Sequence, residues 1–234
     1  MISQLGNIVK SLSGLLYPDL CMACSREAPT QGNDFCLFCQ MDIPFTNHFN
    51  LKENSLLRRF YGRVQLESGA ALFYFTKDSQ VQNMLHELKY KGRSNTAIKL
   101  GRLAAKKWIE TDIFPKPDFI VPVPITPKRK KKRGYNQAFV FGEGVSAEMG
   151  IPCNENILLK TDETDSQTSK SRMDRLKNVQ NAFALQQSEG LNNSHILIVD
   201  DVITTGATIE ACIIQLEKIE NVRFSVLTIA MASD

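Results

Sequence analysis

Residues 196–208, ILIVDDVITTGAT, combine the residue types that a sugar-phosphate site needs. The first four are apolar and mostly β-branched, which predicts a short strand buried on both faces of a parallel sheet. Asp200 and Asp201 follow at the expected end of this strand, and carboxylates are strong acceptors for the vicinal hydroxyls of a ribose. The next loop consists of small residues, Thr204, Thr205, Gly206, Ala207 and Thr208. Such a loop lets backbone N–H groups at a helix start approach a 5′-phosphate.

Other kinds of protein also combine a buried strand with acidic residues. A receiver domain also begins with a buried strand and acidic residues, but only about thirty residues follow Asp201, too few for its α/β run. A nucleoside triphosphatase would need a G-x-x-x-x-G-K-S/T loop, which the chain lacks. An ordinary strand and turn with polar ends remains the plain alternative. The order of apolar strand, Asp-Asp, two residues and Thr-Thr-Gly-Ala-Thr resembles the 5-phosphoribosyl 1-pyrophosphate (PRPP) signature of type I phosphoribosyltransferases.

Four cysteines near the N-terminus form a second chemical pattern. They make two C-x-x-C knuckles separated by eleven residues, Cys21, Cys24, Cys36 and Cys39. Four thiolates at this spacing can hold one tetrahedral zinc, which would stabilise a segment with few apolar residues. A redox or disulfide pair is the alternative. The other two cysteines, Cys153 and Cys212, are expected to be small buried hydrophobic residues.

A run of six basic residues is the third pattern, Lys128, Arg129, Lys130, Lys131, Lys132 and Arg133. Three interpretations stay open. A solvated surface needs none of these charges for function, and a pyrophosphate clamp needs one or two. Binding of nucleic acid would use all six, because each phosphate that is neutralised releases counterions.

Length and composition indicate a globular α/β protein with a small appendage. The chain has 234 residues and a net charge of +3, too small to imply a partner by itself. No apolar run reaches the length of a membrane span, and the N-terminus lacks the shape of a signal peptide. We therefore expect a cytoplasmic protein without membrane insertion, divided into a helix and zinc module at 1–50 and a second domain at 51–234.

Hydrophobic periodicity gives the order of the elements. An amphipathic helix is predicted for residues 1–18, and a polar connector at 44–66 contains three arginines that we expect to be solvated, Arg58, Arg59 and Arg63. A strand begins near Gly69, and a capping box at Ser79 and Gln82 starts a helix that Gly92 would end. Further elements are a helix at 96–110, a strand at 119–124 stopped by its prolines, a helix ending at Gly150 and a strand at 157–159.

The whole set of landmarks resembles the ComF family: the cysteine knuckles, LKYKG, VPVP with RGYNQA, QT before RLKNVQNAF, and DD-x-x-TTGAT. The resemblance implies an α/β type I phosphoribosyltransferase fold, a central mostly parallel sheet flanked by helices, with a small N-terminal four-cysteine zinc module. It also implies a role in DNA uptake and natural transformation, and a DNA helicase of that pathway as a partner. One departure from the family is the nearly continuous basic run.

The resemblance assigns roles to particular residues. Asp200 and Asp201 would bind the ribose as catalytic residues, and residues 204–208 would bind the phosphate. Magnesium would bridge the pyrophosphate and the sugar, and the pyrophosphate loop would use Pro124, Ile125, Arg133 and Arg175. Family signatures fall at Arg133, Gly134, Asn136, Gln137, Gln167, Thr168, Arg175, Asn178 and Phe183. The polar stretch after Lys160 matches the loop that closes over the sugar, where Arg172 and Lys177 could add charge; a disordered insertion is the alternative.

Two functions stay open at this point. In the first, the protein binds PRPP or a related nucleotide and handles single-stranded DNA. In the second, it is a phosphoribosyltransferase that transfers the phosphoribosyl group to an unidentified amine or nucleobase and releases pyrophosphate. The zinc module and connector occupy the place of the acceptor-selecting hood, and neither carries a recognisable acceptor signature. Whether the protein is an enzyme is therefore not decided by the sequence.

Overall fold

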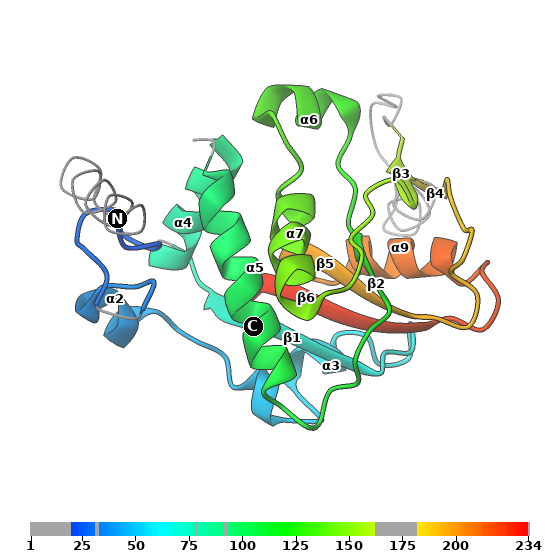
Figure 1. Ribbon diagram of the computed structural model, residues 1–234, viewed down its shortest axis with the longest axis horizontal. Coiled ribbons are helices and arrows are strands. Elements are labelled where there is room, and N and C mark those ends of the chain that lie inside the picture. The colour runs from blue at the N-terminus through cyan, green and yellow to red at the C-terminus, as the bar shows by residue number, and fades with distance from the viewer. Residues whose placement is uncertain (1–19, 31–32, 78, 91–92, 162–181, 234) are drawn as a thin grey trace, which may run out of the picture.

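The computed structural model describes residues 20–30, 33–77, 79–90, 93–161 and 182–233. Within them lies a four-stranded parallel sheet in the order β1-β6-β5-β2 (Figure 1). Its strands are β1 (Ser68–Phe75), β2 (Phe119–Pro122), β5 (His195–Ile203) and β6 (Arg223–Ala232). The apolar run 196–199 is fully buried at the centre of the sheet, as the sequence predicted.

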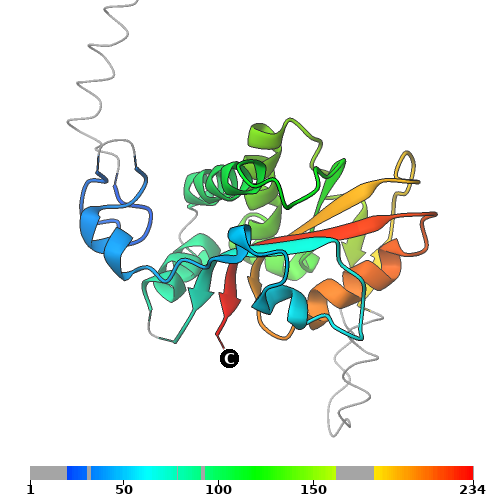
Figure 2. The same cartoon turned by 90° about the horizontal axis from the view of Figure 1, so that it is seen from below.

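Helices cover both faces of this sheet (Figure 2). The first face packs against α4 (Gln80–Tyr90), α5 (Ser94–Ile109) and α7 (Gln137–Met149), and the second against α3 (Ser55–Arg58) and α9 (Ala207–Leu216). Among the described residues, no helix is both long and apolar enough to span a membrane. Parallel strands with helices on both faces are the expected α/β arrangement.

Close helix packing on the first face depends on two glycines. A Cβ atom at Gly101 of α5 would lie 2.2 Å from the Phe141 carbonyl oxygen, and one at Gly144 of α7 would lie 2.2 Å from the Ile98 carbonyl oxygen. Neither distance is possible for a real side chain. The two helices can approach this closely only because both positions are glycine.

Three shorter elements complete the described chain. Helix α6 (Pro127–Arg133) rises above the sheet, and β3 (Leu158–Lys160) pairs antiparallel with β4 (Phe183–Leu185). The cysteine segment contains α2 (Leu37–Asp42) and is followed by a 3₁₀ turn, η1 (His48–Asn50). Residues on both sides of position 50 contact β1, so the division into 1–50 and 51–234 stays a prediction.

Local signals in the sequence have the expected structural effects. The Ser79 hydroxyl accepts a hydrogen bond from the Gln82 backbone N–H at 3.2 Å, which confirms one half of the capping box. The basic run, for which no element was predicted, is a helix because Thr126 caps its start, Pro127 occupies its first turn and Gly134 ends it at φ 86°. The predicted roles of residues 1–18 and Gly92 lie outside the described residues.

Candidate functional site

Asp200 and Asp201 lie within β5, three and two residues before its last residue, and not at its end as predicted. The strand continues because Asp200 and Val202 keep their register with Thr228 and Ala230 of β6. Asp200 Oδ1 accepts a hydrogen bond from the Asp201 backbone N–H at 2.8 Å. Both carboxylates therefore stand at the carboxyl edge of a parallel sheet, where ligands bind in open α/β folds.

A lysine from another helix forms an ion pair with one of these two carboxylates. Lys89, in the last turn of α4, places its Nζ 2.8 Å from Asp201 Oδ2, and both side chains are mostly buried. Burial and the neighbouring charge of Asp201 raise the pKa of Asp200 well above its ordinary value. The site thus consists of one carboxylate, Asp201, that is paired with a lysine and a second, Asp200, that resists ionisation.

The loop after β5 leaves backbone N–H groups without backbone partners. Gly206 precedes α9 at φ 79°, and no side chain caps this helix at that position. Within the described part of the chain, the N–H groups of residues 204–208 donate to no backbone carbonyl. The Ala207 N–H has only a long contact of 3.4 Å with the Thr205 hydroxyl. An anion at this helix start would satisfy these groups.

Two of the connector arginines do more than form a solvated face: Arg59 and Arg63 both bond to the loop after β5, although Arg63 stays exposed as predicted. Arg59 donates to the carbonyl oxygens of Thr204 and Ala232. Arg63 Nη1 donates to the Thr205 carbonyl oxygen at 2.7 Å, and its Nη2 pairs with Glu210 in the first turn of α9. The guanidinium groups thus bind the loop through its carbonyl oxygens. Arg58 and Arg63 are exposed as expected, whereas Arg59 is half-buried.

Phe60, from the same connector, packs beneath the loop. A Cβ atom at Gly206 would lie 3.0 Å from two carbons of its ring. Only glycine combines this close approach with a positive φ. The connector that was expected to be a polar link is therefore the support of the phosphate-sized loop.

The VPVP segment ends at the sheet edge where Asp200 stands. The Val123 N–H donates to the Val199 carbonyl oxygen at 2.9 Å, and Asn136 Nδ2 donates to the Val123 carbonyl oxygen at 3.0 Å. Pro124 and Ile125 follow at the edge where Asp200 stands, because β2 and β5 are parallel neighbours. Asn136 also caps α7 through the Ala138 N–H at 3.1 Å. The RGYNQA signature thus fixes the chain around this edge.

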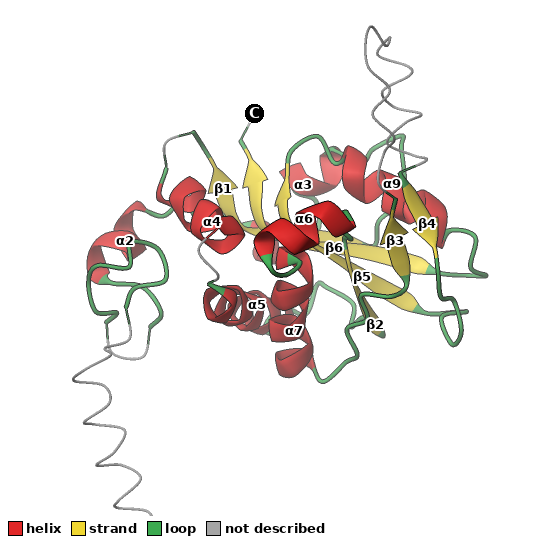
Figure 3. Ribbon diagram, turned by 90° about the horizontal axis from the view of Figure 1, so that it is seen from above, coloured by secondary structure: helices red, strands yellow, loops and turns green. Residues whose placement is uncertain are grey.

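Helix α6 holds the six basic residues at a fixed position above the sheet edge. Lys128 to Lys132 are exposed, and Arg133 is half-buried with its Nη1 bonded to Gln137 Oε1 at 2.8 Å. Lys132 Nζ and the Arg133 guanidinium carbon each lie 5.9 Å from the centre of the Tyr90 ring. Figure 3 shows α6 beside α4, which carries Tyr90. The result is a basic surface with an exposed aromatic ring, next to the acidic pair.

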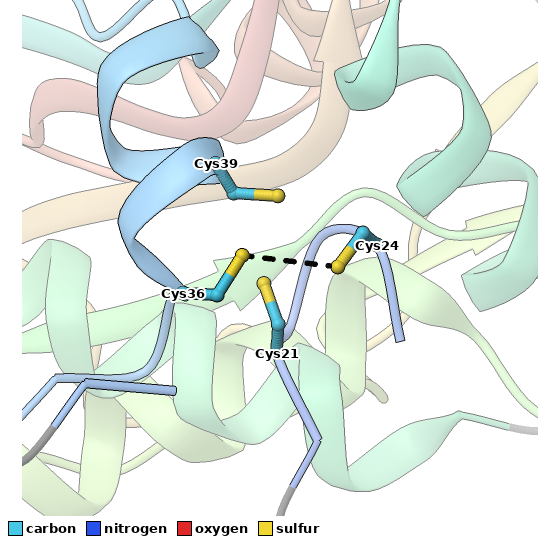
Figure 4. Close-up of side chains that lie close together, drawn as sticks. All are labelled: Cys21, Cys24, Cys36 and Cys39. Atoms are coloured by element: carbon cyan, nitrogen blue, oxygen red, sulfur yellow. Dashed lines mark hydrogen bonds between the residues drawn. The ribbon is translucent and has the colours of Figure 1, made fainter. Parts of the chain in front are cut away.

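The four cysteines converge on one point (Figure 4). Their Sγ atoms all lie within 4.8 Å of one another, and those of Cys24 and Cys36 are 3.9 Å apart. A tetrahedron with metal–sulfur bonds of about 2.3 Å has edges of about 3.8 Å, so the donor set fits a four-thiolate metal. Burial opposes ionisation of the Cys24 thiol, but hydrogen bonds from the Glu27 and Arg26 backbone outweigh it and lower its pKa to about 7.

Comparison with known proteins agrees with these features. Residues 92–232 match the model of the phosphoribosyl transferase domain family. DNA utilization protein YhgH of Escherichia coli O157:H7 is 30% identical over 81% of this chain and 80% of that protein. Competence protein F of Haemophilus influenzae is 36% identical over 49% of this chain and 50% of that protein. This chain belongs to the ComF family. The match with the Haemophilus protein spans only half of that relative's length.

More distant likenesses exist among solved structures. Adenine phosphoribosyltransferase from Leishmania tarentolae is 12% identical, with a TM-score of 0.38 over 62% of this chain and 78% of that one. Glutamine PRPP amidotransferase from Bacillus subtilis is 17% identical, with a TM-score of 0.42 over 61% of this chain and 30% of that one. The fold assignment within the ComF family rests on the domain match and the strand order, and these low scores add nothing to it.

The described residues include most of the family's signature positions. Phe183 is buried on β4, with Lys160 Nζ 4.7 Å from the centre of its ring. The other signature positions of the polar stretch, Gln167, Thr168, Arg175 and Asn178, lie outside the described residues. Lys89, Arg59 and Arg63 were missed as site residues, because their partners are more than a hundred residues away in sequence. The LKYKG motif contained Lys89 but gave no sign of its carboxylate.

Proposed function

We propose that this protein binds PRPP, or a nucleotide with the same ribose 5-phosphate group, at the carboxyl edge of β5. Asp200 and Asp201 would accept hydrogen bonds from the ribose hydroxyls, and the N–H groups of residues 204–208 would bind the 5′-phosphate. The observation that supports this most is the position of two carboxylates and an uncapped helix start at the end of one strand. Pro124, Ile125, Arg133 and Arg175 are the proposed pyrophosphate contacts.

Magnesium is the proposed companion of the ligand. Magnesium would neutralise negative charge on the pyrophosphate oxygens, since it favours oxygen ligands and substrate phosphates. The acidic pair is compatible with a nearby cation, because Asp201 already forms an ion pair with Lys89 at 2.8 Å. The carboxylates would then orient the sugar hydroxyls, and Lys89 would be the group displaced or redirected when the ligand arrives.

We propose single-stranded DNA as the second ligand, held on the basic surface of α6. Relatives named for competence and for DNA utilization support this role. Exposed lysines would neutralise phosphates, and Tyr90 would offer a ring on which a base can stack. The proposed setting is DNA uptake in the cytoplasm, with a helicase of that pathway as a protein partner.

Zinc is the proposed occupant of the cysteine cluster. The Sγ separations and the lowered pKa of Cys24 support a metal held by thiolates. Cys39 also contacts Gln80 of α4, with its Sγ 2.9 Å from Gln80 Oε1. Metal binding would therefore order the cysteine segment and fix it against α4, a structural function and not a catalytic one.

Calorimetric titration of magnesium PRPP into the purified chain tests the nucleotide site. The doubly substituted variant Asp200→Asn, Asp201→Asn should lose the binding heat, whereas the exposed control Glu217→Gln should retain it. Equal affinity of the double variant and the parent chain would contradict the proposed site. Repeating the titration with a single-stranded oligonucleotide present measures whether the two ligands influence each other.

A second candidate function is transfer of the phosphoribosyl group. It is favoured by the intact acidic pair and loop, which a pure DNA-binding protein would not need. The reaction would break the bond between the anomeric carbon and the pyrophosphate, form one to an amine or base nitrogen, and release pyrophosphate. Coupled detection of pyrophosphate with nucleobases and amines tests it. Binding of PRPP with no release for any acceptor tried would argue against this function.

A further inference from the structure

A hollow between the cysteine segment and α5 forms a second basic surface, separate from α6. Its volume is about 710 Å³. Four cations of α5 line it, Lys99, Arg102, Lys106 and Lys107, against two carboxylates, Asp34 and Glu148. Because residues 99, 102 and 106 recur at helical spacing, their charges run along one face of α5 for about 10 Å. The hollow thus carries a line of positive charge.

Two of these cations have no acidic partner among the residues that the structure describes. Within the described part of the chain, neither Arg102 nor Lys107 forms an ion pair. The other two pairs are long and partly exposed, at 3.7 Å between Lys99 and Asp34 and 3.9 Å between Lys106 and Glu110. Such surface pairs contribute little to stability, so Lys106 can exchange its carboxylate for a phosphate.

An aromatic ring stands in the same hollow. Phe45 is 36% exposed, although it also packs edge-on against Phe35 and Phe73 at centroid distances of 5.8 and 4.9 Å. Lys107 Nζ lies 5.8 Å from the centre of its ring. Two buried rings therefore hold Phe45 in place while part of it faces the hollow beside a cation.

We infer that this hollow binds a segment of single-stranded nucleic acid, as a second contact for the strand that α6 engages. Proteins that bind single strands combine a positive groove along the phosphates with aromatic rings for the bases, and this hollow has both. A duplex would fit less well, since its bases are stacked inside and cannot reach Phe45. The inference rests on the proposed DNA function and adds a site formed jointly by the cysteine segment and the core.

Salt-dependent binding of a long oligothymidylate, followed by fluorescence anisotropy, tests the inference on the whole chain. The variant Arg102→Gln, Lys106→Gln should weaken binding roughly 25-fold at 0.1 M salt and reduce the salt slope by about 1.4, because each contact with a single strand contributes about 0.7. The control Lys218→Gln, Arg223→Gln removes two exposed charges near the α9–β6 connection, which lies across Figure 1 from α5. It should leave the slope unchanged.

A variant of α6, Lys128→Gln, Lys131→Gln, separates this inference from the proposed function. If the α6 variant weakens binding and the α5 variant does not, the second contact is refuted and the proposed DNA function stands. If the α5 variant alone weakens binding, the hollow is confirmed as a binding site, but the proposed α6 surface and the idea of a shared strand are both refuted. If neither has an effect, both are refuted.

The aromatic contact has its own test. Phe45→Leu should weaken binding of the normal strand and leave an abasic strand of equal length unchanged, since only the normal strand offers bases for stacking. Thermal unfolding of the variant checks that the fold is retained. Equal loss for both strands, or equal affinity of the parent chain for the two strands, would contradict base stacking on Phe45 and indicate a general polyanion site.

Discussion

Arg63 holds the proposed phosphate loop from its carbonyl side, and replacing it with glutamine should weaken PRPP binding. Its Nη1 donates to the Thr205 carbonyl oxygen at 2.7 Å and to the Arg59 carbonyl oxygen at 3.0 Å, and its Nη2 pairs with Glu210. Without these contacts the loop would sample other conformations. PRPP would then have to order the loop when it binds, and its affinity would fall accordingly.

The size of the effect follows from the geometry of this arginine. A hydrogen bond from a charged group contributes about 1.5–3 kcal/mol, and a surface ion pair about 0–1 kcal/mol. The Arg63 side chain is 30% exposed, so solvent screening favours the lower end. A loss of about 1.5 kcal/mol corresponds to a Kd about tenfold higher, because each factor of ten requires about 1.4 kcal/mol.

Calorimetry with magnesium PRPP measures this change directly. The matched control is Arg58→Gln, on the same connector, whose exposed side chain makes no bond to the loop among the described residues. Thermal unfolding of both variants checks that the fold is retained. A Kd for Arg63→Gln within about twofold of the parent value, or an equal loss in Arg58→Gln, would refute the loop-support argument.

Three further predictions concern stability. Burial and the charge of Asp201 raise the pKa of Asp200, so the stability contributed by its protonated form is lost as the pH rises through that raised pKa. The Asp200→Asn variant should therefore unfold at a higher temperature than the parent chain. Thermal scans should show that this difference grows as the pH rises. Burial lowers the pKa of His48 from 6.5 to about 4, so the free energy of unfolding should decrease by roughly 3 kcal/mol as the pH falls from 6.5 to 4. Urea unfolding of the His48→Gln variant should lack this decrease. Gly101→Ala should destabilise by about 1–3 kcal/mol in urea unfolding, because the clash with Phe141 exceeds the helix-propensity gain of about 1 kcal/mol; a more stable variant would contradict the packing.

The sequence predicted what depends on local pattern. The buried strand before Asp200, the uncapped start of α9, the capping box at Ser79 and the two cysteine knuckles all follow from residues within one or two turns of each other. Those signals were reliable because hydrophobic period, capping chemistry and ligand spacing act over short distances. The four Sγ atoms lie within 4.8 Å of one another, as two knuckles that share one metal would require.

What the sequence did not predict depends on tertiary contacts. Arg59 and Arg63 looked like solvated charges because nothing near them in sequence could accept their protons, yet their acceptors are carbonyl groups brought in by β5 and β6. Lys89 was part of a recognised motif, but only the packing of α4 beside β5 gives it a carboxylate. The strand also continued through the acidic pair, since ladder hydrogen bonds with β6 outweigh the weak β-propensity of aspartate.

The end of α4 connects the two proposed ligand sites through three consecutive residues. The Leu88 carbonyl oxygen accepts from the Tyr135 hydroxyl, Lys89 binds Asp201, and Tyr90 lies beside the cations of α6. A ligand that donates hydrogen bonds to Asp201 would compete with Lys89 and so act on the turn that positions Tyr90. Because thermodynamic coupling is reciprocal, DNA that orders Tyr90 and α6 must change PRPP affinity by the factor with which PRPP changes DNA affinity. We therefore expect the proposed nucleotide site and the proposed DNA surface, which share one helical turn, to influence each other's occupancy, and calorimetry with both ligands measures that influence.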